Sequence, residues 1–162
     1  MIKQEIRVGI SDKNTAFSPD KIYTVGLGSC IGIALYDRGL RLGGLAHIML
    51  PCSTQFSNVS NPLKFDDLAI PLLLEDMQML GSRKQNVIAK IAGGASMFNF
   101  PDKKLNMDVG KRNSAAVKEV LDHMSITLIS EDTGGNKART MILDTNTGIV
   151  SIKTIGMGVA EI

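Results

Sequence analysis

The stretch YTVGLGSCIGIALYD, residues 23–37, is where both the fold and the candidate site begin. Short β-rich runs on either side of a turn predict strands at residues 22–25 and 31–36. The turn between them contains the small residues Gly26, Gly28 and Ser29. The turn ends at Cys30. A tight turn of this kind often holds a nucleophile, whereas a structural cysteine is usually packed in a core.

The rest of the chain predicts further strands and two helices. Strands are expected at residues 5–10, 42–50, 87–91 and 126–130, with a hairpin of residues 140–143 and 149–152 around DTNTG. Apolar residues at helical spacing predict amphipathic helices over residues 65–80 and 114–124. Asn113 is the expected N-cap of the second helix. Because the strands do not alternate regularly with helices, the pattern favours the α+β class over a doubly wound sheet.

Composition limits the classes of function. The chain has 162 residues, of which 44% are hydrophobic and 21% charged, as expected for a single globular domain over residues 1–162. A net charge of +2 and an aromatic content of 4% argue against a nucleic-acid partner. The sequence contains neither a signal-peptide pattern nor the roughly 18 apolar residues of a membrane helix. We therefore expect a cytoplasmic protein with reduced thiols and no membrane insertion.

Cysteine chemistry requires a thiolate, a base and a group that orients the base, and the chain offers two histidines as bases. His47 lies in the apolar run GGLAHIML, where a histidine is either a core residue or a base beside the Cys30 strand. The residues alone leave both interpretations open. His123 lies near the end of the second helix, where the helix dipole favours a charged imidazole. A structural or solvent-facing role is expected for it.

Cys30 also has two interpretations, a small buried residue at a strand start or a nucleophile among free backbone N–H groups. Cys52, which follows Pro51, is an alternative nucleophile, and it could join Cys30 and His47 in a metal site. The spacing 30, 47, 52 matches no standard zinc pattern and lacks a fourth ligand, so neither a metal nor a cofactor is expected. The blocks AGGASMF and EDTGGNKAR lack the P-loop lysine and are expected to be scaffold or substrate wall.

Five blocks of the sequence, in order, resemble those of the CheD family of chemoreceptor glutamine deamidases. They are TVGLGSC, GGLAHIMLP, KIAGGASMF, VGKRN and EDTGGNKAR, between about residues 22 and 140. By position, the resemblance implies a catalytic cysteine at Cys30, a histidine at His47 and a third catalytic residue at Thr24. It also implies a mixed β-sandwich with helices packed outside, similar to the catalytic domain of cytotoxic necrotizing factor toxins. Gly28 and Ser29 are expected to contribute to oxyanion or substrate binding.

The resemblance implies a protein-glutamine deamidase that acts on the cytoplasmic helices of methyl-accepting chemotaxis receptors and releases ammonia through a thioester. We expect His47 to take the Cys30 proton and form a thiolate–imidazolium pair. The family resemblance also implies association with the phosphatase CheC. Two alternatives are an adaptor for CheC in which catalysis is dispensable and a different cysteine amidohydrolase.

Overall fold

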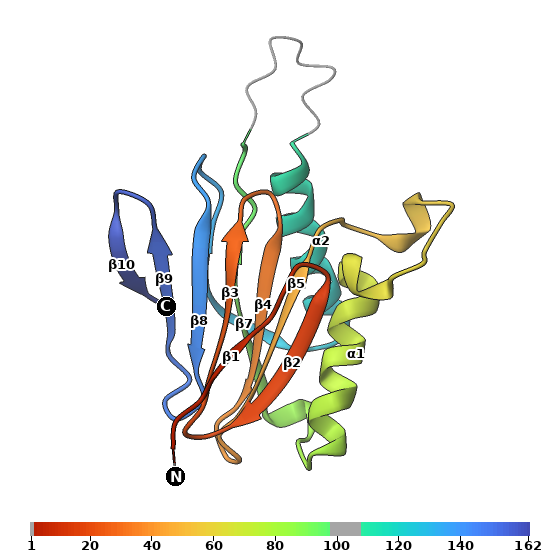
Figure 1. The fold of residues 1–162 in the computed structure, drawn as a ribbon. Helices are drawn as coiled ribbons and strands as arrows, with labels where there is room; N and C mark the ends of the chain where they lie inside the picture. The colour runs from red at the N-terminus through yellow and green to blue at the C-terminus, as the bar shows by residue number, and fades with distance from the viewer. Residues whose placement is uncertain (1, 98–107) are drawn as a thin grey trace.

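The computed structural model describes residues 2–97 and 108–162, which form two sheets and two longer helices (Figure 1). One sheet, called sheet A, has the strand order β1 (Glu5–Arg7), β3 (Lys21–Leu27), β8 (Arg139–Asp144), β9 (Val150–Thr154) and β10 (Gly158–Glu161). Sheet B has the order β2 (Asp12–Phe17), β5 (Leu42–Ile48), β4 (Ile31–Asp37), β6 (Val87–Gly93) and β7 (Thr127–Thr133). The β1–β3 and β6–β7 pairs are parallel and the other pairs are antiparallel, so both sheets are mixed.

The helices α1 (Asp66–Met79) and α2 (Val109–His123) cover the face of sheet B that points away from sheet A. Within the described residues, three short 3-10 turns lie in the connections, at Ser53–Gln55, Pro62–Lys64 and Lys84–Asn86. None of the helices in the described ranges is long and apolar enough to cross a membrane. The resulting layers are helices, sheet B and sheet A.

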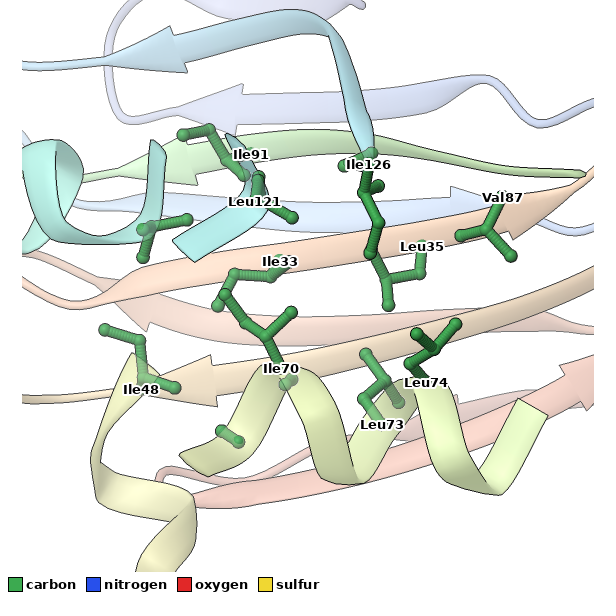
Figure 2. Close-up of a cluster of buried hydrophobic side chains, with 14 of the residues drawn as sticks. Ile33, Leu35, Ile48, Ile70, Leu73, Leu74, Val87, Ile91, Leu121 and Ile126 are labelled. Carbon is green, nitrogen blue, oxygen red and sulfur yellow. The ribbon is translucent and has the colours of Figure 1, made fainter. Parts of the chain in front are cut away.

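Two hydrophobic clusters hold the layers together. Side chains alternate along a strand, so Ile33 and Leu35 of β4 face the helices, where they meet Ile70 and Leu73 of α1 (Figure 2). Ala34 on the opposite face of β4 belongs to the second cluster, which fills the space between the sheets. Because both faces of β4 and β5 are covered, every residue of these two strands is buried. This explains their nearly uninterrupted apolar sequences.

The expected α+β class is confirmed, as are the sandwich with two helices outside and the β8–β9 hairpin. The expected N-cap of α2 is wrong. This helix begins at Val109, and the side chain of Asp108 caps it by accepting from Lys111 N at 3.0 Å. Strand β2 was not expected, because its sequence DKNTAF is polar at an edge of sheet B and its pairing with β5 is long-range. The short exposed strand β10 was also not expected.

Candidate active site

Thr24 and His47 meet in the space between the two sheets. Thr24 lies on β3 of sheet A, His47 lies on β5 of sheet B, and both side chains are fully buried. Thr24 Oγ1 lies 2.7 Å from His47 Nδ1 and 2.7 Å from the carbonyl oxygen of Val8. The hydroxyl has one proton and a carbonyl oxygen can only accept, so that proton is donated to Val8. His47 Nδ1 must then donate to Thr24, which leaves Nε2 as the unprotonated nitrogen.

Cys30 lies on the same face of sheet B as His47. Gly32 stands opposite His47 in the β4–β5 pair, and Cys30 precedes Gly32 by two residues. Its side chain packs against the cluster between the sheets and remains partly exposed. Such diagonal neighbours have Cα atoms about 7–8 Å apart, within reach of long or aromatic side chains. His47 Nε2 is buried and has no hydrogen-bond partner in the described part of the chain.

The backbone turn that carries Cys30 is held by hydrogen bonds to three successive carbonyl groups. The donors are Ala95 N to Gly28 at 2.8 Å, Asn113 Nδ2 to Ser29 at 2.9 Å, and Gly94 N to Cys30 at 2.9 Å. In a trans peptide the N–H points opposite to the C=O, so these bonds also fix the directions of the Ser29 and Cys30 amides. Over residues 2–97 and 108–162, neither amide donates to a backbone carbonyl or a side-chain oxygen. Neither N–H group is therefore committed to a protein oxygen in the described residues.

Gly28 leaves space at this turn because it has no side chain. A Cβ at Gly28 would lie 3.1 Å from the side chain of Met97. Its own amide donates to Gly26 O at 3.0 Å, within the turn. Gly26 has φ +72° and lies in an irregularity of the β3–β8 register that begins after Thr24. The irregularity turns the chain from β3 toward Cys30.

Of the two glycine pairs noted in the sequence, Gly93 and Gly94 pack against the turn. Gly93 has a φ of +113°, and a Cβ there would lie only 2.2 Å from the carbonyl oxygen of Cys30. Arg139 joins the two pairs, since its guanidinium donates to Gly93 O at 2.7 Å and to Gly134 O at 2.5 Å. It also forms an ion pair with Asp132 at 3.2 Å. Gly93 and Gly94 thus support the turn that carries Cys30, and the arginine that links the two pairs was not expected from the sequence.

Asn113 belongs to the site, although the sequence analysis assigned it to a helix end. It is fully buried within α2, and its Nδ2 donates to the carbonyl oxygens of both Ser29 and Met49, each at 2.9 Å. Ser29 directly precedes Cys30, and Met49 follows His47 by two residues. One side chain thus links the two candidate segments. Only its place in the block VGKRN could have indicated this, because the contacts are long-range.

Burial favours the neutral forms of both reactive groups. It lowers the pKa of His47 to about 4. It also raises the pKa of the Cys30 thiol, an effect that the backbone N–H of Cys30 partly offsets. At neutral pH both groups are therefore uncharged in the free protein, which differs from the expected thiolate–imidazolium pair. The transfer of the thiol proton must then accompany the attack on a substrate.

Cys52 and His123 have other surroundings. Cys52 Sγ lies 3.1 Å from Thr54 Oγ1 and 3.7 Å from a carboxylate oxygen of Asp67. The His123 side chain is 77% exposed and lies 3.7 Å from Glu119, which confirms its solvent-facing role. Among the residues that the structure describes, no three His, Cys, Asp or Glu side chains are grouped so that they could hold a metal ion.

Comparison with known proteins identifies relatives along almost the whole chain. The family model for CheD, described as chemotactic sensory transduction, matches residues 49–154. Proteins of Clostridium novyi, Clostridium kluyveri and Clostridium acetobutylicum are 65%, 64% and 62% identical to this chain. The alignments cover 100%, 98% and 98% of this chain and 100%, 98% and 96% of those proteins. Each relative is named "Probable chemoreceptor glutamine deamidase CheD".

A solved structure of the Bacillus licheniformis hypothetical protein YfiH is 16% identical, with a TM-score of 0.48. That alignment covers 77% of this chain and 51% of YfiH. The family match and the relatives at 62–65% identity show that the chain belongs to the CheD family.

Proposed function

We propose that this chain is a protein-glutamine deamidase that converts glutamine side chains of chemoreceptors to glutamate and releases ammonia. Its relatives are named chemoreceptor glutamine deamidases. The observation that carries the assignment of roles is the contact between Thr24 Oγ1 and His47 Nδ1, since it leaves Nε2 free on the face that holds Cys30. A cysteine next to a base of fixed tautomer is the arrangement that nucleophilic attack on an amide requires.

In the first step, Cys30 Sγ attacks the side-chain amide carbon of the glutamine while His47 Nε2 takes the thiol proton. The imidazolium that forms keeps its other proton on Nδ1, and this N–H donates a hydrogen bond to Thr24 Oγ1. The amide oxygen becomes negative and is stabilised by the backbone N–H groups of Ser29 and Cys30. Gly28 contributes no side chain here, and the side chain of Met97 packs beside it.

In the second step, the tetrahedral carbon expels its nitrogen, which leaves as ammonia with the proton from His47 Nε2. A thioester between Cys30 and the glutamyl carbon remains. Water then attacks the thioester while His47 takes one of its protons, the C–S bond breaks, and the proton returns to the sulfur of Cys30. The balance is one amide and one water to one carboxylic acid and one ammonia, without a cofactor.

The resemblance supports a cytoplasmic location, because it implies receptor helices in that compartment as the substrate. We treat residues 1–162 as one catalytic domain. Helices cannot enter a deep pocket, and the partial exposure of Cys30 is compatible with access by a single side chain from a helix surface. Association with the phosphatase CheC stays part of the proposal, on the resemblance alone.

The decisive experiment incubates a cytoplasmic chemoreceptor fragment with the wild-type protein or with Cys30→Ala and measures the intact mass of the fragment. Each deamidation replaces NH₂ by OH and adds about one dalton. We expect the mass increase with the wild-type protein, its loss in Cys30→Ala, and its retention in the matched control Cys52→Ser. In cells, full receptor modification with Cys30→Ala would favour the adaptor alternative. In the incubation with the fragment, cleavage of its backbone would indicate a different amidohydrolase.

A further inference from the structure

Asn113 is an unusual residue for the interior of this helix. Its side chain is fully buried, and its Oδ1 has no hydrogen-bond partner in the described part of the structure. A buried polar atom without a partner costs about 1–3 kcal/mol of stability. Rotating the amide would place Oδ1 against the carbonyl oxygens of Ser29 and Met49, so only the present orientation makes hydrogen bonds. A function other than stability would explain why an asparagine occupies this position.

The bond from Asn113 to Ser29 acts on the peptide that joins Ser29 to Cys30. This peptide is planar, so holding its C=O on the side of α2 points its N–H in the opposite direction. The neighbouring carbonyls of Gly28 and Cys30 are held by backbone amides of the Gly94–Ala95 segment. Asn113 therefore provides the one side-chain bond among the three that fix the turn.

The bond from Asn113 to Met49 acts on the other candidate segment. Met49 directly follows β5, the strand that carries His47. The same amide nitrogen thus ties the end of the histidine strand to the cysteine turn. Loss of this side chain would release both carbonyls at once.

We propose that Asn113 is the positioning residue of the oxyanion site: it holds the Ser29 carbonyl so that the Cys30 N–H faces the substrate oxygen that becomes negative. The inference rests on the proposed function, because it assigns a role within the same reaction. Asn113 acts through the backbone of the turn, so it is not itself a catalytic residue. The effect belongs to the transition state, in which the oxygen carries charge, more than to substrate binding.

Deamidation and alkylation both use the Cys30 sulfur, and comparing their rates distinguishes a role in the oxyanion site from a general effect on Cys30 and His47. Deamidation develops an oxyanion, and the loss of one oxyanion donor typically lowers kcat by about 10²–10³-fold. Alkylation by iodoacetamide uses the same sulfur and the same base but attacks a saturated carbon and forms no oxyanion. A residue that only kept Cys30 beside His47 would affect both reactions to a similar extent.

The test uses Asn113→Ala and Asn113→Asp in a Cys52→Ser background, in which alkylation reports on Cys30 alone. The aspartate keeps the size of the side chain, but it donates to neither carbonyl when ionised and to at most one when protonated. We expect kcat for deamidation of the receptor fragment to fall about 10²-fold, with KM and the alkylation rate near their wild-type values. Thr145→Val is the matched control, since Thr145 is fully buried and donates to Asp20 O at 2.5 Å beyond the far end of β4. It should keep the wild-type kcat.

A folded Asn113 variant with the wild-type kcat would overturn the inference. So would a parallel loss of deamidation and alkylation, because that result would assign Asn113 to the thiol and imidazole instead of the oxyanion. If Asn113→Ala does not fold, the isosteric Asn113→Asp decides between these outcomes. Failure of the proposed function is separately visible, since the wild-type protein would then leave the mass of the fragment unchanged.

Discussion

Replacement of Thr24 by valine removes one hydroxyl and preserves the branched shape of the side chain. The change leaves two buried groups without their partner, the carbonyl oxygen of Val8 and the Nδ1–H of His47. The imidazole then loses the acceptor that keeps its proton on Nδ1. A larger fraction of His47 carries the proton on Nε2 and cannot accept one from Cys30.

The expected size of the effect follows from these two lost contacts. Each unsatisfied buried group costs about 1–3 kcal/mol, so the free energy of unfolding should fall by about 2–6 kcal/mol for the two groups together. The hydrogen bond that selects the tautomer contributes about 1–2 kcal/mol, and each 1.4 kcal/mol changes an equilibrium about tenfold. We therefore expect kcat to fall about 5–30-fold in Thr24→Val. Thr24→Ser keeps the hydroxyl and should retain most of kcat.

The assay measures initial rates of ammonia release from a chemoreceptor fragment, and urea unfolding gives the stability of each variant. The reasoning would be refuted by a folded Thr24→Val protein that keeps the wild-type kcat. A loss of kcat in Thr24→Ser as large as that in Thr24→Val would contradict it equally, because the hydroxyl would then not be the group that matters.

Three further outcomes follow from burial and backbone geometry. The pKa of His47 is about 4 in the folded chain and 6.5 in its ordinary state, so the unfolded chain binds more protons between these values. Between pH 6.5 and pH 5, the free energy of unfolding of the wild type, measured with urea, should therefore fall by about 2 kcal/mol more than that of His47→Asn. Equal decreases in the two proteins would contradict this. Burial raises the pKa of Asp66 from 3.8 to about 7, so its contribution to stability is lost as pH rises. Asp66→Asn should therefore raise the free energy of unfolding more at pH 8 than at pH 5, and a gain independent of pH would exclude this account. Gly93→Ala should abolish deamidation because its Cβ would lie 2.2 Å from Cys30 O, whereas Gly134→Ala, with nothing within 4 Å, should cost about 1 kcal/mol of stability and keep kcat.

Sequence reasoning reached the features that local patterns determine. The apolar runs of β4 and β5 and the helical spacing of α1 predicted these elements within a few residues. The position of Cys30 after a glycine-rich turn, with His47 on a neighbouring strand, indicated two of the candidate residues. Each of these signals lies within about ten residues of the chain, where side-chain periodicity and turn chemistry act.

The remaining features depend on contacts between distant segments. Asn113 has a good N-cap side chain, but Asp108 begins the helix, and the role of Asn113 comes from carbonyls 84 and 64 residues away. The contact of Thr24 with His47 joins two sheets, and spacing along the chain contains no information about it. The low pKa of His47 comes from burial alone and could not be assigned before the surrounding layers were known.

The reactive groups are divided between two layers, with Thr24 on sheet A and His47 and Cys30 on the side of sheet B. The backbone hydrogen bonds lie within each sheet. The 2.7 Å contact between Thr24 Oγ1 and His47 Nδ1, which orients the base, crosses the interface between the two sheets. A slip of one sheet past the other by about an ångström would break that contact and leave every strand paired. The rate of deamidation therefore depends on how closely the two sheets pack. At low denaturant concentration this rate should fall before the secondary structure unfolds.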